Sequence, residues 1–285
     1  MAAAKEKLLP ADDFPGWDTE ELAVKLSGRL KGLAFFTVVT AGYLGAAVAG
    51  APEGPLPPPS PARAAAECAL ALAILVELGV STFLMPAPTK DQDVYPLMSI
   101  AGEATYLTVW ILYFQSVHML ATAAAETLQA CGVPCPRLVT FTHAAAVFIG
   151  TVGIMLTLLF LKFNYFEEKW QIEVRQLWER RGVPFGFYSL VEHVPSLPVG
   201  ILDVLVRDRR FLRLCCPSLA ANSAVVLAFS LLYFVWMHLL WWLTGYKCWP
   251  YPFLKDLDTL PKRLVLLVVI FISMMAVLAP LSLLV

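Results

Sequence analysis

The chain of 285 residues is 59% hydrophobic and only 15% charged, and its mean hydropathy is +0.69. This composition excludes an ordinary soluble domain and predicts an all-α, polytopic bundle of membrane-spanning helices. The net charge of -1, with Lys and Arg concentrated in loops, argues against nucleic-acid binding. The six cysteines do not have the spacing of a zinc site, and we expect neither a metal nor an organic cofactor.

Residues 1–29 are polar and mixed in charge, and we interpret them as a cytosolic N-terminal segment. Asp18 can cap a short helix that carries Leu22, Leu26 and Leu30 on one face. Such a helix is expected to lie along the membrane interface. The segment contains no cleavable signal with a short apolar core, so the first apolar run would serve as a signal anchor.

The remainder, residues 30–285, is predicted to be a membrane domain that contains seven apolar runs. The runs cover residues 30–50, 64–85, 103–123, 138–161, 187–206, 219–243 and 264–285. The first two are weakly hydrophobic because they are rich in Ala and Gly, and the fifth holds three ionisable residues and two prolines. We therefore predict six or seven spans, according to whether residues 187–206 cross the membrane or turn back.

Two segments between the runs have a distinct composition. Residues 51–62, APEGPLPPPSPA, are too rich in proline for a helix and are expected to form an extended loop. Residues 164–182 are amphipathic, with Trp170 and Trp178 on one side and basic residues interleaved. They predict an interfacial helix, with a solvated loop helix as the alternative.

The distribution of basic residues predicts the orientation. With seven spans, 15 of the 21 Lys and Arg residues fall on the N-terminal side, and a re-entrant fifth run gives the same division. Because cytosolic loops carry the excess of positive charge, the N-terminus is expected in the cytosol, while the side of the C-terminus stays open. The host membrane is expected to be the endoplasmic reticulum or the plasma membrane.

The fifth run carries Glu192, His193 and Asp203 where a lipid-facing helix would carry apolar residues. Ionisable residues inside a membrane are candidates for function. His193 is the sharpest candidate because imidazole can take and return a proton near neutral pH. The alternative is that its ring makes a hydrogen bond between helices.

Thr108 is the candidate partner of His193. It lies five residues into the third run, and His193 lies six residues into the fifth, so both are predicted roughly 8 to 9 Å below the same membrane face. A threonine hydroxyl that is deprotonated by an imidazole can attack an ester carbonyl. No complete triad is visible, because Glu192 is expected to point away from His193 and Asp203 is ten residues further on. The alternative for Thr108 is a hydrogen bond to a carbonyl of its own helix.

Three further residues are candidates for the substrate pocket. Gln115 is two turns from Thr108 on nearly the same helix face, where it could line the pocket. Trp241 and Trp242 are typical of an aromatic belt at the membrane interface, with contact to substrate as the other possibility. The remaining histidines, His118, His143 and His238, lie on Ala-rich or aromatic faces and are expected to pack rather than react.

Three blocks, taken in order, resemble the androgen-induced-gene family of membrane proteins. The blocks are GEATYLTVWILYFQ (102–115), HVPSLPVGILD (193–203) and YFVWMHLLWWLTGYKCWPYPFL (233–254). Where the family tends to have paired histidines, this chain has Trp241 and Trp242, and two extra residues follow Gly245. The chain therefore resembles a divergent member.

The resemblance implies hydrolysis of lipid esters such as fatty acid esters of hydroxy fatty acids. It assigns the nucleophile to Thr108 and the general base to His193, and we expect Gln115, Asp203, Trp241 and Trp242 to bind the substrate. The alternative is a non-enzymatic transporter, channel or lipid-binding scaffold whose polar residues line a path. The two halves of the chain show no internal repeat, which argues against a transporter.

Overall fold

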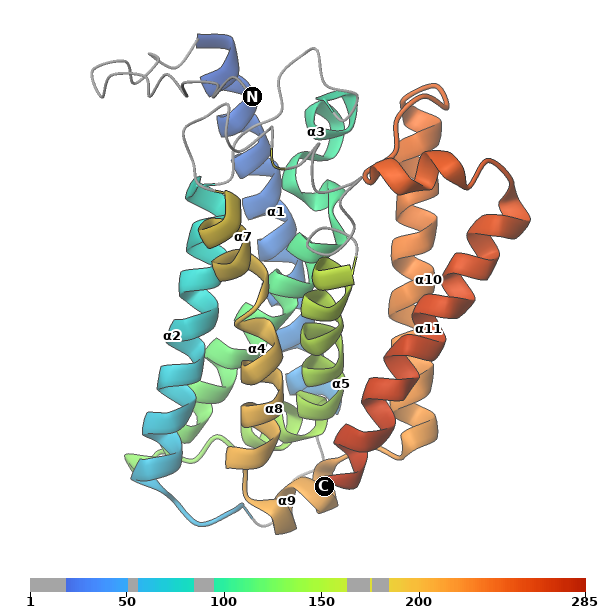
Figure 1. The fold of residues 1–285 in the computed structure, drawn as a ribbon. Coiled ribbons are helices and arrows are strands. Elements are labelled where there is room, and N and C mark those ends of the chain that lie inside the picture. Colours follow the sequence, from blue (N-terminus) through green and yellow to red (C-terminus); the bar gives the residue numbers. More distant parts are fainter. Residues whose placement is uncertain (1–18, 51–55, 85–94, 163–174, 176–184) are drawn as a thin grey trace, which may run out of the picture.

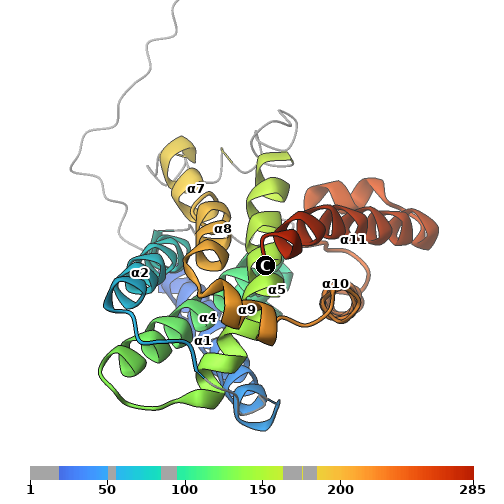
Figure 2. The ribbon, with the colours of Figure 1, turned by 90° about the horizontal axis from the view of Figure 1, so that it is seen from below.

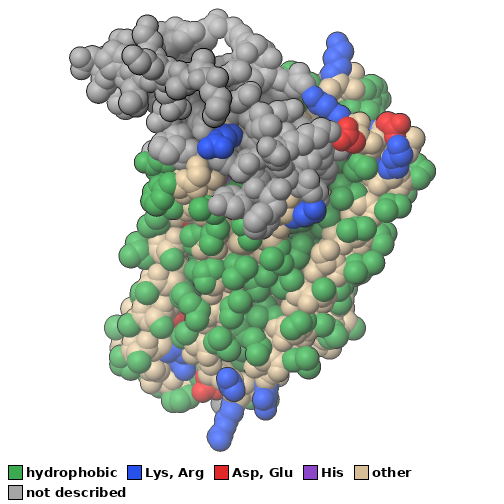
Figure 3. Space-filling model, viewed as in Figure 1, with side chains coloured by type: hydrophobic (Ala, Val, Ile, Leu, Met, Phe, Trp, Pro, Cys, Tyr) green, Lys and Arg blue, Asp and Glu red, His purple; other side chains and the backbone are tan. Residues whose placement is uncertain are grey.

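The computed structural model describes residues 19–50, 56–84, 95–162, 175 and 185–285. This part of the chain is helical throughout apart from short connections, and it contains seven segments long and apolar enough to cross a membrane. The prediction of an all-α membrane bundle is confirmed. In Figure 3, hydrophobic side chains cover the described spans, whereas Lys and Arg gather near the two ends.

The described helices run up and down along one another (Figure 1). In chain order they are α1 (Thr19–Gly50), α2 (Pro61–Leu84), α3 (Tyr95–Ala101), the 3-10 helix η1 (Gly102–Thr105), α4 (Leu107–Ala130), α5 (Pro136–Phe160), α7 (Phe185–His193), α8 (Ser196–Val206), α9 (Arg209–Cys215), α10 (Leu219–Leu243), the 3-10 helix η3 (Pro252–Asp256) and α11 (Leu260–Leu283). Seen along the bundle in Figure 2, helices α1, α2, α4, α5 and α8 form one group, and α10 and α11 stand together at its side.

The fifth apolar run crosses the bundle instead of turning back. Helices α7 and α8 follow one another down the molecule in Figure 1, and together they contain the apolar segment Gly186–Val206. The helix is interrupted around Pro195, whose ring removes a backbone donor. Because the number of crossings is odd, α1 begins and α11 ends at opposite ends of the bundle.

The third span differs most from its predicted form. The predicted helix 103–123 is interrupted at Tyr106, which is extended, and it is preceded by Gly102, which has φ +57°. A Cβ atom at Gly102 would lie 2.7 Å from the carbonyl oxygen of Gly28 in α1, so both the backbone conformation and the helix contact require glycine here. Helix α4 therefore starts at Leu107, which places Thr108 in a first turn.

The structure tests only some of the predictions for the N-terminal helix and the two connecting segments. The helix expected around Leu26 and Leu30 is continuous with the first span, because α1 runs without interruption to Gly50. Within the predicted proline-rich loop 51–62, residues 56–60 are non-helical, but its last two residues are the first two of α2, which begins at Pro61. The predicted interfacial helix 164–182 lies outside the described residues apart from residue 175. The division into segments 1–29 and 30–285 stays a prediction.

Helices α5 and α8 pack closely against each other. A Cβ atom at Gly150 would be 2.8 Å from the carbonyl oxygen of Gly200, so the two backbones approach as closely as glycines allow. Helix α11 also packs on α5, next to Gly150 through Leu281. Toward their other ends α10 and α11 enclose a pocket against α4 and α5.

Candidate active site

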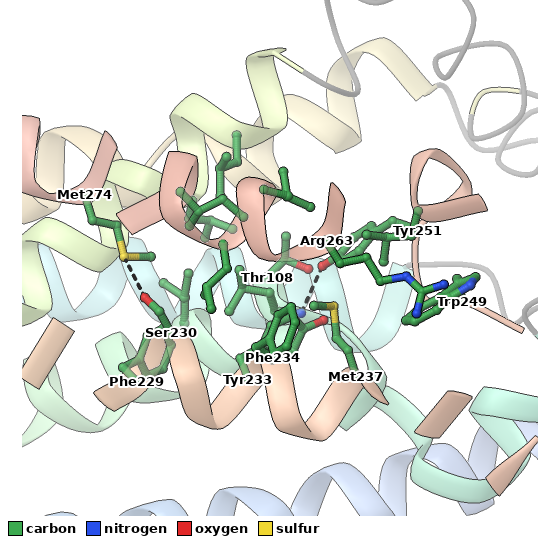
Figure 4. Close-up of a pocket in the computed structure, with 18 of the residues that line it drawn as sticks. Thr108, Phe229, Ser230, Tyr233, Phe234, Met237, Trp249, Tyr251, Arg263 and Met274 are labelled. Carbon is green, nitrogen blue, oxygen red and sulfur yellow. Dashed lines mark hydrogen bonds between the residues drawn. The ribbon is translucent and has the colours of Figure 1, made fainter. Parts of the chain in front are cut away.

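A pocket lies among α4, α5, α10, α11 and the loop that precedes α11. Its empty volume is about 1000 Å³, which includes the space at its open side. Its walls are mainly aliphatic and aromatic, which suits a hydrophobic ligand. The polar residues that line it are Thr108, Ser230, Tyr233, His238, Tyr251 and Arg263. Figure 4 shows Thr108 near the middle of the pocket, Met274 toward one end and Trp249 toward the other.

Thr108 sits at a helix start, where the first N–H groups have no partner within the helix. The N–H group of Leu107 donates to the Tyr251 hydroxyl at 2.9 Å (Figure 4), and the Thr108 side chain interacts with the same hydroxyl. The Tyr233 hydroxyl, close to that of Tyr251, donates to the carbonyl oxygen of Thr105 at 3.0 Å. Thr108 thus lies at the start of a helix, beside the hydroxyl of Tyr251 and at one wall of an apolar pocket that Tyr233 also lines.

His193 is the last residue of α7 and is held by two elements. Its Nδ1 lies 2.8 Å from the carbonyl oxygen of Ser189, so Nδ1 carries the proton and Nε2 keeps its lone pair. The imidazole stacks on Phe160 of α5, with ring centres 4.0 Å apart and planes inclined by 8°. The hydroxyl of Thr157, also in α5, donates to the carbonyl oxygen of His193. This geometry leaves Nε2 available as a base.

Phe160 is the structural element that relates the two predicted catalytic residues. Phe160 lines the pocket together with Thr108, and it stacks on His193, which is not among the lining residues. No hydrogen bond joins Thr108 to His193 in the part of the chain that the structure describes. Glu192 lies closer than expected, with its carboxylate 3.7 Å from Nδ1 of His193, so the expectation that it points away is wrong.

His238 is a second imidazole, and it lines the pocket itself. Its Nδ1 donates to the carbonyl oxygen of Phe234 at 2.8 Å, and its Nε2 is buried without a hydrogen-bond partner among the described residues. Sequence reasoning assigned it to packing. A signal was present, because residues 230, 233, 234, 237 and 238 follow the spacing of one helix face, and that face lines the pocket.

The predicted substrate-binding tryptophans are divided. Trp241 stacks on Trp249 with ring centres 4.8 Å apart, and both rings lie against the guanidinium of Arg263, a residue that lines the pocket. Trp242 is 56% exposed on the outside of α10. Trp241 therefore supports one end of the pocket, whereas Trp242 faces away from the bundle.

Gln115 lies between helices rather than in the pocket. Its Nε2 donates to the carbonyl oxygen of Ser196 in α8 at 3.2 Å. Gly153 of α5 leaves the room for it, because a Cβ atom there would lie 2.6 Å from the same nitrogen. The amide thus joins α4 to α8, three residues beyond His193. Its predicted role toward substrate stays a prediction.

Asp203 belongs to a separate buried ion network. Its carboxylate contacts Arg207 at 2.6 Å and His118 Nε2 at 3.0 Å, and Arg207 also donates to Thr122 at 2.9 Å. The Tyr43 hydroxyl in α1 lies 2.7 Å from the other ring nitrogen of His118. These contacts join α1, α4 and α8 and lie outside the pocket walls, so the predicted substrate role of Asp203 also remains a prediction.

A model of the FAR-17a/AIG1-like protein family matches residues 66–284, which are 219 of the 285 residues. The chain belongs to this family. The family match runs from α2 to the end of α11 and so includes Thr108, His193 and every wall of the pocket, whereas α1 lies outside it. No curated protein and no solved structure matches the chain. The predicted resemblance to the androgen-induced-gene family is confirmed.

The described residues contain no group of three or more His, Cys, Asp or Glu side chains placed to hold a metal ion. The groups of this FAR-17a/AIG1-like chain that are available for chemistry near the pocket are a hydroxyl, two imidazoles, two phenols and one guanidinium. A hydroxyl beside backbone donors, together with imidazoles near the same pocket, can in principle carry out acyl transfer.

Proposed function

We propose that this FAR-17a/AIG1-like protein is an intramembrane hydrolase of lipid esters in which Thr108 is the nucleophile. The observation that supports it most is the position of Thr108, at the first turn of a helix whose start opens into an apolar pocket. The pocket walls suit a long acyl chain, and the helix start offers N–H groups where negative charge develops. Fatty acid esters of hydroxy fatty acids are the substrates that the family resemblance implies.

The proposed reaction has two steps. A base takes the proton from the Thr108 hydroxyl as its oxygen bonds to the ester carbonyl carbon, and the positive end of the α4 helix dipole stabilises the resulting oxyanion. The carbonyl re-forms, and the alcohol leaves with the proton that the base returns. Water then attacks the acyl-threonine in the same manner, which releases a carboxylic acid and restores Thr108.

His193 is the proposed base. The Nδ1 bond to Ser189 leaves Nε2 free to accept a proton, and the nearby Glu192 carboxylate would stabilise the imidazolium that forms. Because Phe160 both stacks on His193 and lines the pocket, a rotation of its ring would bring Nε2 and the Thr108 hydroxyl into one space. His238 is the rival base, since its unpartnered Nε2 already shares the pocket with Thr108.

Hydrolysis by the purified full-length protein in lipid nanodiscs, with a fatty acid ester of a hydroxy fatty acid as substrate, tests these roles. We expect Thr108→Ala to lower kcat by at least about 10³-fold, and His193→Ala by about 10²- to 10⁴-fold. His238→Ala is expected to stay within a few-fold of the wild type. The matched control is Thr151→Ala, because that buried hydroxyl donates to the carbonyl oxygen of Val147 at 2.7 Å in its own helix.

The outcomes separate the alternatives. A large loss in His238→Ala with little change in His193→Ala would transfer the role of base to His238. A wild-type protein that neither cleaves esters nor reacts with a fluorophosphonate would end the hydrolase proposal. If such a protein still binds lipid without turnover, a lipid-binding scaffold is the better description.

We also propose that the N-terminus faces the cytosol, because the ends of the spans on its side carry 15 of the 21 Lys and Arg residues. With seven crossings the C-terminus then lies in the lumen or outside the cell. An acceptor site for N-glycosylation that is added after Val285 should be modified. Modification of a site added before Met1 instead would reverse the orientation. Microscopy of the tagged chain would distinguish the endoplasmic reticulum from the plasma membrane.

A further inference from the structure

Arg263 is the one charged side chain among the residues that line the pocket, and it is only 7% exposed. Its Nε donates to the carbonyl oxygen of Leu257 at 2.8 Å, and its Nη2 donates to that of Asp258 at 3.2 Å. A guanidinium has five N–H donors. The remaining donors, including both on Nη1, have no hydrogen-bond partner among the described residues.

No carboxylate of the described chain balances this cation. The pocket walls contain neither Asp nor Glu. The Asp258 carboxylate is engaged by Lys262, whose Nζ lies 2.6 Å from it on the outside of the molecule. Aromatic faces supply part of the compensation, since the guanidinium carbon is 4.6 Å from the ring centres of both Trp241 and Trp249. A buried cation without an anion is costly, and a ligand anion would relieve that cost.

The pocket is polar at one end and apolar at the other. In Figure 4, Arg263 extends toward Trp249 at one end, Met274 and Phe229 lie toward the other, and Thr108 is between them. Arg263 and Met274 are both in α11 and eleven residues apart, which corresponds to roughly 16 Å along the helix. A ligand that fills the pocket therefore has a long apolar body and an anionic end.

We propose that Arg263 binds the carboxylate of a long-chain ligand, and that Trp241 and Trp249 hold the guanidinium in position for it. The planar fork of arginine matches a carboxylate with two parallel hydrogen bonds. A phospholipid phosphate carries the same charge, but its two-chain glycerol body fits an exposed rim better than a cation that is 7% exposed. Together with the proposed hydrolase function, on which this step rests, the substrate would be an ester that retains a free carboxylate.

The test compares an acid with its neutral ester. Binding of 9,10-dibromostearic acid and of its methyl ester to the purified full-length protein is measured by quenching of tryptophan fluorescence. The wild type should bind the acid at least about tenfold more tightly than the methyl ester. Arg263→Gln should bind the two equally, and Arg263→Lys should keep part of the preference. The control is Lys262→Gln, which removes a neighbouring cation that is outside the pocket and should keep the full preference.

Retained binding of the methyl ester would show that the pocket of Arg263→Gln is intact. If that variant does not fold, the wild-type comparison decides, and equal affinities for acid and methyl ester would overturn the proposal. Displacement of the acid by phosphatidic acid but not by oleic acid would also overturn it, in favour of a lipid headgroup. A wild type that prefers the acid but cleaves no ester keeps the carboxylate site and loses the hydrolase. Equal cleavage of carboxylate-bearing and methyl-capped esters would keep the hydrolase proposal and overturn the carboxylate site.

Discussion

Two groups of polar side chains lie among the spans, and they differ in what they bond to. The carboxylate of Asp203 has both Arg207 and His118 as partners, and His118 in turn contacts Tyr43. In the pocket, the hydrogen bonds of Arg263 to the described chain use only Nε and Nη2, and Nε2 of His238 is buried without a partner among the described residues. The Asp203 carboxylate and the His118 ring are satisfied from within the chain, although Nη1 of Arg207 is also buried without a partner among the described residues. The unpartnered groups of Arg263 and His238 differ in that they belong to residues that line a cavity.

The difference distinguishes residues that hold helices together from residues that we propose to bind a ligand. Inside a membrane, a polar group costs free energy unless it is paired. The Asp203 carboxylate and the His118 ring meet this requirement with contacts that join α1, α4 and α8, in the compact group of helices in Figure 2. The pocket lies instead where α10 and α11 stand at the side of that group. An ionisable residue in a span can therefore have a structural role, and its presence alone does not indicate function.

Loss of the Asp203 carboxylate should have the largest effect on stability. Asp203→Ala leaves the guanidinium of Arg207 buried without its ion-pair partner, which typically costs about 3 to 5 kcal/mol. We expect a much lower melting temperature of the purified protein, or failure to purify. The control is Asp258→Ala, because its pair with Lys262 is exposed and its loss should leave the melting temperature unchanged. Equal melting curves for the two variants would contradict a structural role for the network.

A smaller loss is expected where α5 meets α8. In Gly150→Ala the new methyl group would lie 2.8 Å from the carbonyl oxygen of Gly200, which forces the helices apart at a cost of about 1 to 3 kcal/mol. Thermal unfolding in detergent measures this cost. Gly45→Ala is the matched control, since nothing lies within 4 Å of its added Cβ and alanine favours the helix. A Gly150→Ala protein as stable as that control would show that this contact is not tight.

A substitution in the pocket should have a small effect on stability and a larger effect on function. Tyr251→Phe removes the hydroxyl that accepts the Leu107 N–H group beside Thr108, a net loss of about 1 kcal/mol. The activation free energy of ester hydrolysis should rise by more than this amount, because the same hydroxyl interacts with the proposed nucleophile. Melting curves and kcat measured on one preparation test the pair of effects. A fall in stability with unchanged kcat would place Tyr251 among the structural residues.

The spans could be predicted because each is a long apolar run with clear ends. The sixth run, 219–243, coincides with α10, and the Ser218 hydroxyl caps its first turn. The interruption before Thr108 could not be predicted in the same way. It follows the contact of Gly102 with Gly28 in another helix, and an isolated glycine directly before an apolar run does not indicate such a neighbour.

The candidate site was predictable only in part, for a similar reason. Thr108 was found from its depth and its family pattern, and the structure places it in a pocket. Arg263 was not found, because it lies one residue before the predicted run 264–285 and resembles an ordinary interfacial flank. Its aromatic neighbours, Trp241 and Trp249, come from α10 and the following loop, and only the fold brings them to it.

Most of the pocket wall is built from spans, since it is formed by α4, α5, α10 and α11. The proposed long-chain ligand would therefore reach it from the bilayer, where its relevant concentration is a mole fraction of membrane lipid. Adding inert phospholipid at a fixed amount of ligand dilutes that ligand in two dimensions and should lower pocket occupancy, although its molarity in the sample is unchanged. An apparent affinity for this protein consequently has meaning only when the ratio of lipid to ligand is stated with it.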